Sequence, residues 1–245
     1  MTRPGKQYGT LYGIGVGPGD PELITLKAVN RLKKVDVVFA AASTKNEASL
    51  AQSIAAPHLR EGVAIIRLDF PMTRDQAVLT KAWRTNADTV AGLLAEGKDA
   101  AFLTLGDPLT YSTFGYLLRT LNGLLSEIPV EVIPGITSYQ AAAAFTGRVL
   151  AESGESLAVV SGVATEEELT RILSAADSAV ILKAYKNLPT IRRVLAKLGL
   201  ADSAVFVTRL GHEGQEVITN LSSVPDKPSY FSLVLVRRSQ KGQQG

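Results

Sequence analysis

The feature that most constrains this chain is an alternation of short apolar, β-rich runs with longer amphipathic segments. Strands are expected at 10–16, 35–40, 63–68, 99–105 and 130–133. Helices are expected at 45–56, 73–96, 112–125 and 137–145. Parallel strands require long crossover connections, which are usually helices. The pattern therefore predicts an α/β fold with a parallel sheet.

The alternation resumes after an irregular stretch at 148–155, which is flanked by glycines. Further strands are expected at 157–161, 179–183, 204–208, 215–219 and 230–237, with helices at 166–175 and 188–198. The last two strands suggest an antiparallel pair in a mixed sheet. A chain of 245 residues can bury two cores. We expect two tandem αβα domains, 1–150 and 151–238, followed by a disordered polar tail at 239–245.

Composition excludes several classes of function. The chain has no cysteine, which rules out disulfides, thiolate metal sites and a cysteine nucleophile. Its histidines, His58 and His212, lack partners at metal-ligand spacing, so no metal is expected. The net charge of +3 comes from scattered Lys and Arg, which argues against nucleic acid and suits a small polyanion. No apolar run reaches the ~20 residues of a membrane helix and the first residues are polar, so we expect a cytoplasmic protein.

A glycine-rich bend follows the first expected strand, with glycines at 13, 15, 17 and 19 before Asp20-Pro21. The spacing fits neither the Rossmann fingerprint nor the P-loop. One interpretation is a tight turn in which Asp20 caps a helix that begins at Pro21. The other is an exposed backbone floor beneath a flat ligand, with Asp20 facing that ligand.

Two more polar bends follow later strands, at 104–113 and 133–138. Open α/β sheets bind ligands at the carboxyl ends of their strands, so three such bends indicate one shared site, although each alone could be a capped turn. Carboxylate and carbonyl oxygens suit a positively charged sulfonium. No Gly-x-Ser-x-Gly elbow is present. Methyl transfer fits these features because alignment of donor and acceptor can supply ~7–11 kcal/mol without a protein nucleophile.

Taken together, the segments 15–23, 106–108 and 134–138 resemble the tetrapyrrole methylase family in order and spacing. The resemblance extends from residue 11 to residue 237, and the combination of motifs is specific although each motif alone is weak. It implies two αβα domains, a homodimer, and S-adenosylmethionine held in a folded conformation in a cleft between the domains.

Within that family, the segments 70–73, 106–116 and 230–233 are similar to the C-20 methyltransferases of precorrin-2 and cobalt-factor II. The implied activity is methylation of ring carbon 20 in cobalamin synthesis, with S-adenosylhomocysteine as product. One alternative is a uroporphyrinogen-III C-methyltransferase of the sirohaem route, a group that lacks the closing Tyr-Phe-Ser segment. The other is a non-catalytic tetrapyrrole carrier. The sequence leaves open whether the substrate contains cobalt.

The resemblance also implies roles for individual residues. The expected cofactor-binding residues are Leu105, Gly106, Asp107, Thr110, Thr137, Ser138, Tyr185, Arg209, Leu210 and Ser232. Candidates to pair with the acidic arms of the substrate are Arg74, Lys183, Lys186 and Arg209, and candidates to stack on its ring are Tyr111, Tyr116 and Tyr230. Asp20 or Tyr111 is expected to assist proton removal. For each basic residue the alternative is a solvated surface charge, and for the aromatic residues it is a core position.

Overall fold

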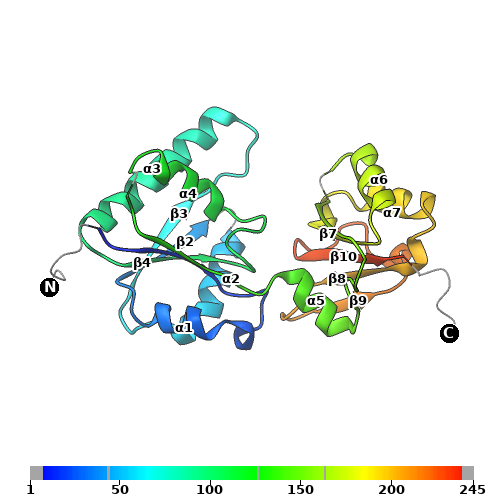
Figure 1. The fold of residues 1–245 in the computed structure, drawn as a ribbon, viewed down its shortest axis with the longest axis horizontal. Helices are drawn as coiled ribbons and strands as arrows, with labels where there is room; N and C mark the ends of the chain where they lie inside the picture. Colours follow the sequence, from blue (N-terminus) through cyan, green and yellow to red (C-terminus); the bar gives the residue numbers. More distant parts are fainter. Residues whose placement is uncertain (1–7, 43–44, 126, 163, 239–245) are drawn as a thin grey trace. The chain divides into compact units, whose positions relative to one another are not determined.

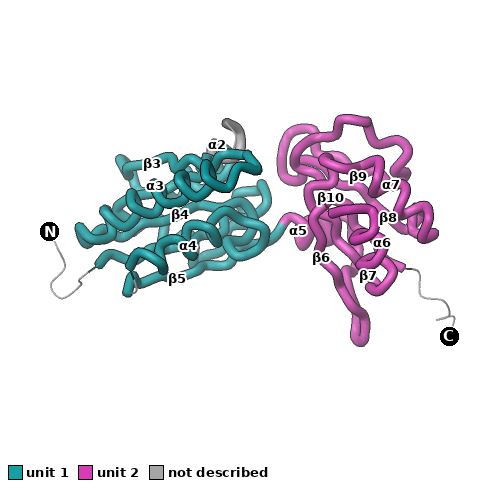
Figure 2. The backbone as a smooth tube through the Cα atoms, turned by 90° about the horizontal axis from the view of Figure 1, so that it is seen from above, with its two compact units in different colours: residues 1–137 teal, residues 138–245 magenta. Residues whose placement is uncertain are grey.

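The computed structural model describes residues 8–42, 45–125, 127–162 and 164–238, so the tail expected at 239–245 lies outside the described residues. The chain divides into two compact units, Met1–Thr137 and Ser138–Gly245 (Figure 2). Each unit contains one five-stranded sheet. The expectation of two tandem α/β units is thereby confirmed.

The sheet of the first unit is entirely parallel, with strand order β3-β2-β4-β1-β5. Its strands are β1 (Leu11–Gly15), β2 (Val37–Ala42), β3 (Ala64–Asp69), β4 (Ala100–Thr104) and β5 (Val130–Ile133). The α-helices are α1 (Leu26–Leu32), α2 (Lys45–Ala55), α3 (Gln76–Ala95) and α4 (Phe114–Asn122), with short 3-10 turns at Pro21–Leu23 and Ala56–His58.

Helices cover both faces of this sheet, as Figure 1 shows for α1 on one side and α3 and α4 on the other. Every residue of β4 is buried, and alternate side chains point to opposite faces. Phe102 packs with Phe114 of α4, and their ring centroids are 5.5 Å apart. Leu103 belongs to the core formed with Ala28 of α1 and Ile54 of α2. The first unit is therefore an αβα layer structure.

The second unit has a mixed sheet with strand order β6-β7-β10-β8-β9. Its strands are β6 (Leu157–Ser161), β7 (Ser178–Leu182), β8 (Ala204–Thr208), β9 (Glu216–Ile218) and β10 (Ser232–Arg237). Its α-helices are α5 (Ser138–Thr146), α6 (Glu166–Ala175) and α7 (Leu188–Lys197), with 3-10 turns at Ala184–Lys186, Ala201–Ser203 and Leu221–Ser223. β10 runs antiparallel to β7 and β8, and β8 separates it from β9. The mixed sheet is confirmed, but its last two strands do not pair with each other.

The division between the units lies after Thr137, earlier than the boundary expected at residue 150. The reason is α5, which the sequence pattern had joined to the first domain. Ala142 of α5 is fully buried in a core with Val180, Val205 and Leu235 of the second sheet. α6 and α7 pack against the other face through residues such as Leu169 and Ile191. The second sheet needs α5 to bury its remaining apolar face.

Candidate functional site

Three bends meet at one edge of the first unit. β4, β1 and β5 are adjacent and parallel, so the segments that follow them leave from the same edge of the sheet. The amide of Gly106 donates to the carbonyl of Gly17 at 2.8 Å, which joins the first bend to the second. The amide of Gly135 donates to Oδ2 of Asp107 at 3.2 Å, which joins the second to the third. The expected convergence of these bends is confirmed.

The Asp107 carboxylate holds this arrangement together. Its Oδ1 accepts from the amide of Leu109 at 2.9 Å and from the hydroxyl of Thr110 at 3.2 Å. Its Oδ2 accepts from Gly135 on the neighbouring bend. Each carboxylate oxygen therefore has a partner within the chain, and the side chain fixes the bends. Contact of Asp107 with a cofactor remains a prediction.

The glycines at 13 and 15 serve internal packing. A Cβ on Gly13 would lie 2.4 Å from Cζ of Phe114, and one on Gly15 would lie 2.4 Å from the carbonyl oxygen of Gly106. Both spaces are already filled by protein atoms. The interpretation of these two glycines as an open floor for a flat ligand is therefore wrong: they allow a helix and a neighbouring bend to approach the strand.

Asp20 and Tyr111, the expected proton-transfer residues, both lie in bends of the first unit. Oδ1 of Asp20 accepts from the amide of Glu22 at 2.9 Å and caps only the three-residue 3-10 turn Pro21–Leu23, whereas the helix expected from Pro21 begins at Leu26 and is capped by Thr25. Tyr111 has a left-handed backbone, with φ of 52°, and its side chain is 52% exposed. Both side chains are accessible, and their catalytic role stays a prediction. Leu105 and Thr137 lie on the same bends, at the ends of β4 and β5.

The second unit brings its own expected residues to one edge of its sheet, where β7 and β8 end and β10 begins. The amide of Tyr185 donates to Oγ of Ser232 at 3.1 Å. The amide of Arg209 donates to the carbonyl of Phe231 at 2.8 Å. Leu210 packs against the core beneath α5. Ser138 begins α5 and belongs to this unit.

Two of the three aromatic candidates, Tyr230 and Tyr116, contact other rings. The ring centroid of Tyr230 lies 5.0 Å from that of Tyr185 and 5.1 Å from that of Phe231. Tyr116 stacks on Trp83, with ring centroids 4.7 Å apart and an interplanar angle of 8°. The sequence reasoning missed Trp83 because this contact depends on how α3 packs against α4. The Arg119 guanidinium also lies over the Tyr116 ring, 5.0 Å from its centre, so Tyr116 is held by two internal contacts and its stacking on a substrate ring stays a prediction.

The basic candidates fall in two places. Arg74 is exposed in the loop before α3 of the first unit. Lys183, Lys186 and Arg209 all follow strands of the second unit at the edge described above. Lys186 is exposed and its ammonium lies 5.9 Å from the centre of the Tyr185 ring.

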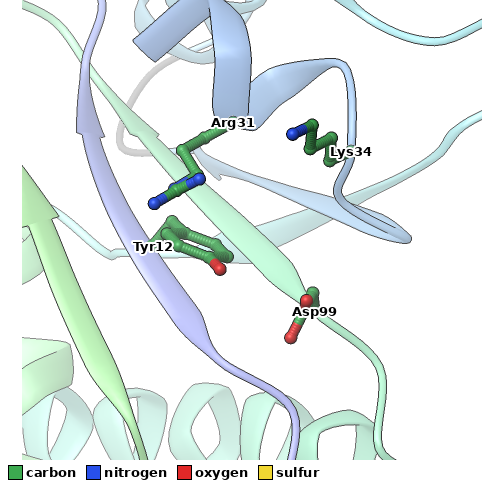
Figure 3. Close-up of a pocket in the computed structure, with 4 residues that line it drawn as sticks. All are labelled: Tyr12, Arg31, Lys34 and Asp99. Carbon is green, nitrogen blue, oxygen red and sulfur yellow. The ribbon is translucent and has the colours of Figure 1, made fainter. Parts of the chain in front are cut away.

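A pocket of about 180 Å³ in the first unit lies away from the bends and is lined by Tyr12, Arg31, Lys34 and Asp99 (Figure 3). It lies toward the amino-terminal ends of β1 and β4. The Arg31 guanidinium is 5.4 Å from the centre of the Tyr12 ring and pairs with Glu131 at 3.2 Å. The lining thus contains two cations and one carboxylate, and Arg31 is already paired with Glu131, which Lys27 also contacts at 2.7 Å.

The described residues contain no group of three or more His, Cys, Asp or Glu side chains that could hold a metal ion. In the same part of the chain, no helix has the length and apolar character needed to cross a membrane.

The chain matches known proteins over most of its length. A sequence profile described as Tetrapyrrole (Corrin/Porphyrin) Methylases matches residues 10–225. The chain is 37% identical to a precorrin-2 C(20)-methyltransferase from a Sinorhizobium species, over 95% of this chain and 96% of the relative. It is 35% identical to the cobalt-precorrin-2 C(20)-methyltransferase of Salmonella typhimurium LT2, over 94% of this chain and 97% of the relative.

Solved structures show the same fold. A cobalt precorrin-4 methyltransferase superposes with a TM-score of 0.73 at 21% identity and covers 93% of this chain and 94% of its own. A Thermus thermophilus uroporphyrin-III C-methyltransferase, solved in complex with S-adenosylhomocysteine, gives a TM-score of 0.66 at 24% identity, over 94% of this chain and 97% of its own. Since the profile spans most of the sequence and both sequence relatives align over nearly their full length, the chain belongs to the tetrapyrrole (corrin/porphyrin) methylases.

Proposed function

We propose that this chain transfers a methyl group from S-adenosylmethionine to carbon 20 of precorrin-2 or of its cobalt-containing form in cobalamin biosynthesis. The observation that carries the proposal is the sequence identity of 37% and 35%, over nearly the full length of this chain, to two relatives that are both named C(20)-methyltransferases. The three joined bends supply a site whose residue types suit this reaction. No protein nucleophile is needed, because the ring carbon attacks the methyl group.

The bends of the first unit fit the cofactor. A Cβ on Gly106 would lie 3.8 Å from Cα of Thr137 and 3.9 Å from the carbonyl oxygen of Ile136, which is ordinary van der Waals contact, so this left-handed bend lies directly beside the third bend. The groups around it are backbone carbonyls and amides and the hydroxyls of Thr110 and Thr137. Such oxygens suit both a sulfonium and a nucleoside. When bound, S-adenosylmethionine supplies a methyl group activated by a positively charged sulfur, and S-adenosylhomocysteine is released.

The chain's contribution is chiefly positional. Asp107 fixes the second and third bends, so the backbone around Gly106 is held in place before a ligand binds. Asp20 has one carboxylate oxygen without a hydrogen-bond partner among the described residues, and Tyr111 presents an exposed phenol. The Asp20 carboxylate could accept the proton that carbon 20 loses once its new bond to the methyl carbon has formed and the bond from that carbon to sulfur has broken, whereas the Tyr111 phenol could assist only as a relay that releases its own proton to water as it takes up another.

The test is methyl transfer by the purified chain under anaerobic conditions. Precorrin-2, cobalt-precorrin-2 and uroporphyrinogen III would each be incubated with S-adenosylmethionine labelled with ¹³C in the methyl group. We expect one label at carbon 20 of one of the first two substrates. Two labels on uroporphyrinogen III and none on the others would instead identify a uroporphyrinogen-III methyltransferase. A chain that binds tetrapyrrole but no donor would be a carrier.

We infer that the working form of the enzyme is a cytoplasmic homodimer that acts on a small molecule, without nucleic acid or membrane as partner. Light scattering on the purified protein measures the assembly, and a monomer at micromolar concentration would contradict the homodimer. Fractionation of the producing cells measures the location.

A further inference from the structure

Among the described residues, the non-glycine residues with a left-handed backbone are Tyr111, Lys183 and Arg209, with φ of 52°, 56° and 51°. A side chain makes this conformation unfavourable, because Cβ approaches the following carbonyl oxygen. All three lie in the bends that carry the expected site residues. Strained backbone of this kind tends to occur at functional sites, so each of these three residues is a candidate for a functional role.

The side chain of Arg209 has an internal role. Its Nε donates to Oγ of Ser229 at 3.4 Å, and a terminal guanidinium nitrogen donates to the carbonyl of Glu213 at 3.4 Å. These contacts tie the loop after β8 to the segment before β10. An arginine at this position is therefore accounted for by the fold of the second unit.

Lys183 differs. Its side chain is half-buried, yet it forms no hydrogen bond or ion pair with any residue that the structure describes. The turn itself is fixed by backbone contacts: the amide of Gly162 donates to the carbonyl of Leu182 at 2.6 Å, and the amide of Lys186 donates to that of Lys183 at 3.2 Å. Glycine would meet these requirements with less strain. Internal packing thus explains the backbone conformation but not the lysine.

We propose that Lys183 is a carboxylate-binding residue of this enzyme. Lys183 lies at the edge of the second sheet that also carries Tyr185, Arg209 and Ser232, and the partial burial of this residue strengthens an ion pair relative to one in open solvent. The proposal rests on the proposed function, which supplies two sources of carboxylate: the acidic arms of the tetrapyrrole and the amino-acid end of the methyl donor.

Three substitutions separate charge from strain. Lys183→Met removes the charge and keeps the strained backbone, Lys183→Arg keeps both, and Lys183→Gly removes both. We expect Lys183→Met and Lys183→Gly to raise one KM about tenfold or more, and Lys183→Arg to stay near wild type. Lys183→Gly should in addition raise the melting temperature by about 2–4 °C. The substrate whose KM rises identifies the source of the carboxylate.

Lys197→Met is the matched control, because Lys197 is exposed in the last turn of α7, at the opposite end of that helix from the turn that contains Lys183. It should change neither KM. Wild-type KM values for both substrates in Lys183→Met would overturn the proposal. Direct binding of S-adenosylhomocysteine and of uroporphyrin, an octacarboxylic porphyrin, to wild type and Lys183→Met tests Lys183 even if precorrin-2 is not methylated. Equal affinities of both proteins for both probes would refute it, whereas failure of C-20 methylation alone would refute only the proposed function.

Discussion

The close approach of three backbone segments in the first unit makes Gly135→Ala a severe substitution. A Cβ at this position would lie 2.1 Å from the carbonyl oxygen of Gly106 and 2.8 Å from Gly15, whereas Cβ atoms essentially never approach other atoms within 3.0 Å. Gly135 does not have a positive φ, so alanine is allowed by its backbone conformation. The cost is therefore purely steric. All of the clashing atoms belong to backbone, so no side chain can rotate away.

Relief of this clash requires one bend to move by roughly 1 Å, which breaks the link between Asp107 and Gly135. We expect Gly135→Ala to lower the free energy of unfolding of the first unit by about 3 kcal/mol or more. Trp83 is the only tryptophan in the sequence and lies in this unit, so its fluorescence during urea unfolding reports on the first unit alone.

Gly92→Ala is the matched control. Gly92 lies in the exposed interior of α3, and nothing lies within 4 Å of the position that its Cβ would take. The same chemical change should there raise stability by about 0.5–1 kcal/mol, because alanine favours helix. If urea unfolding of Gly135→Ala has the midpoint and slope of wild type, the steric reasoning is refuted. Equal effects of Gly135→Ala and Gly92→Ala on the free energy of unfolding would refute it as well.

Two further predictions concern carboxylates of the first unit. In Asp107→Asn, an NH₂ group replaces one of the two carboxylate oxygens that now accept hydrogen bonds. This should lower the free energy of unfolding by about 1–3 kcal/mol and weaken the binding of S-adenosylhomocysteine, measured by calorimetry. Unchanged affinity would contradict this. A hydrogen bond from Lys27, together with Arg31, lowers the pKa of Glu131 below its ordinary value of 4.5. Wild type should therefore be more stable than Glu131→Gln above pH 4.5, and the difference should vanish as the pH falls through the lowered pKa. A difference independent of pH would exclude this ion pair as its source.

Local signals in the sequence predicted the elements whose ends are fixed by their own residues. β5, β6, α6 and β8 begin and end where the pattern placed them. α6 starts with a capping box, in which Thr165 and Glu168 satisfy each other's amides. The expected helix at 73–96 begins instead at Gln76, because Asp75 accepts from the amides of Ala77 and Val78. Such signals act within one helical turn, so they can be recognised in the sequence without knowledge of the tertiary structure.

The sequence pattern could not predict properties that depend on contacts between residues far apart in the chain. α5 buries small residues such as Ala141 and Ala142, which would fit either sheet, so its assignment required the structure. The same limit applies to the glycine-rich bend, since Phe114 and Gly106, which occupy the space beside Gly13 and Gly15, lie far along the chain. The convergence of the bends was predictable because parallel strands end at a common edge.

Glycines and left-handed residues therefore indicate function in different ways once the fold is known. Gly13, Gly15 and Gly135 allow protein atoms to approach one another, so their absence of side chains is explained without a ligand. Lys183 is the converse case: its turn would accept glycine, yet it carries a long cationic side chain that no described residue binds. A residue that the fold disfavours and no internal contact explains is the stronger indication of a ligand. By this criterion, the specificity of the enzyme is to be sought in the side chains at the edge of the second sheet, while the bends of the first unit provide a rigid backbone frame.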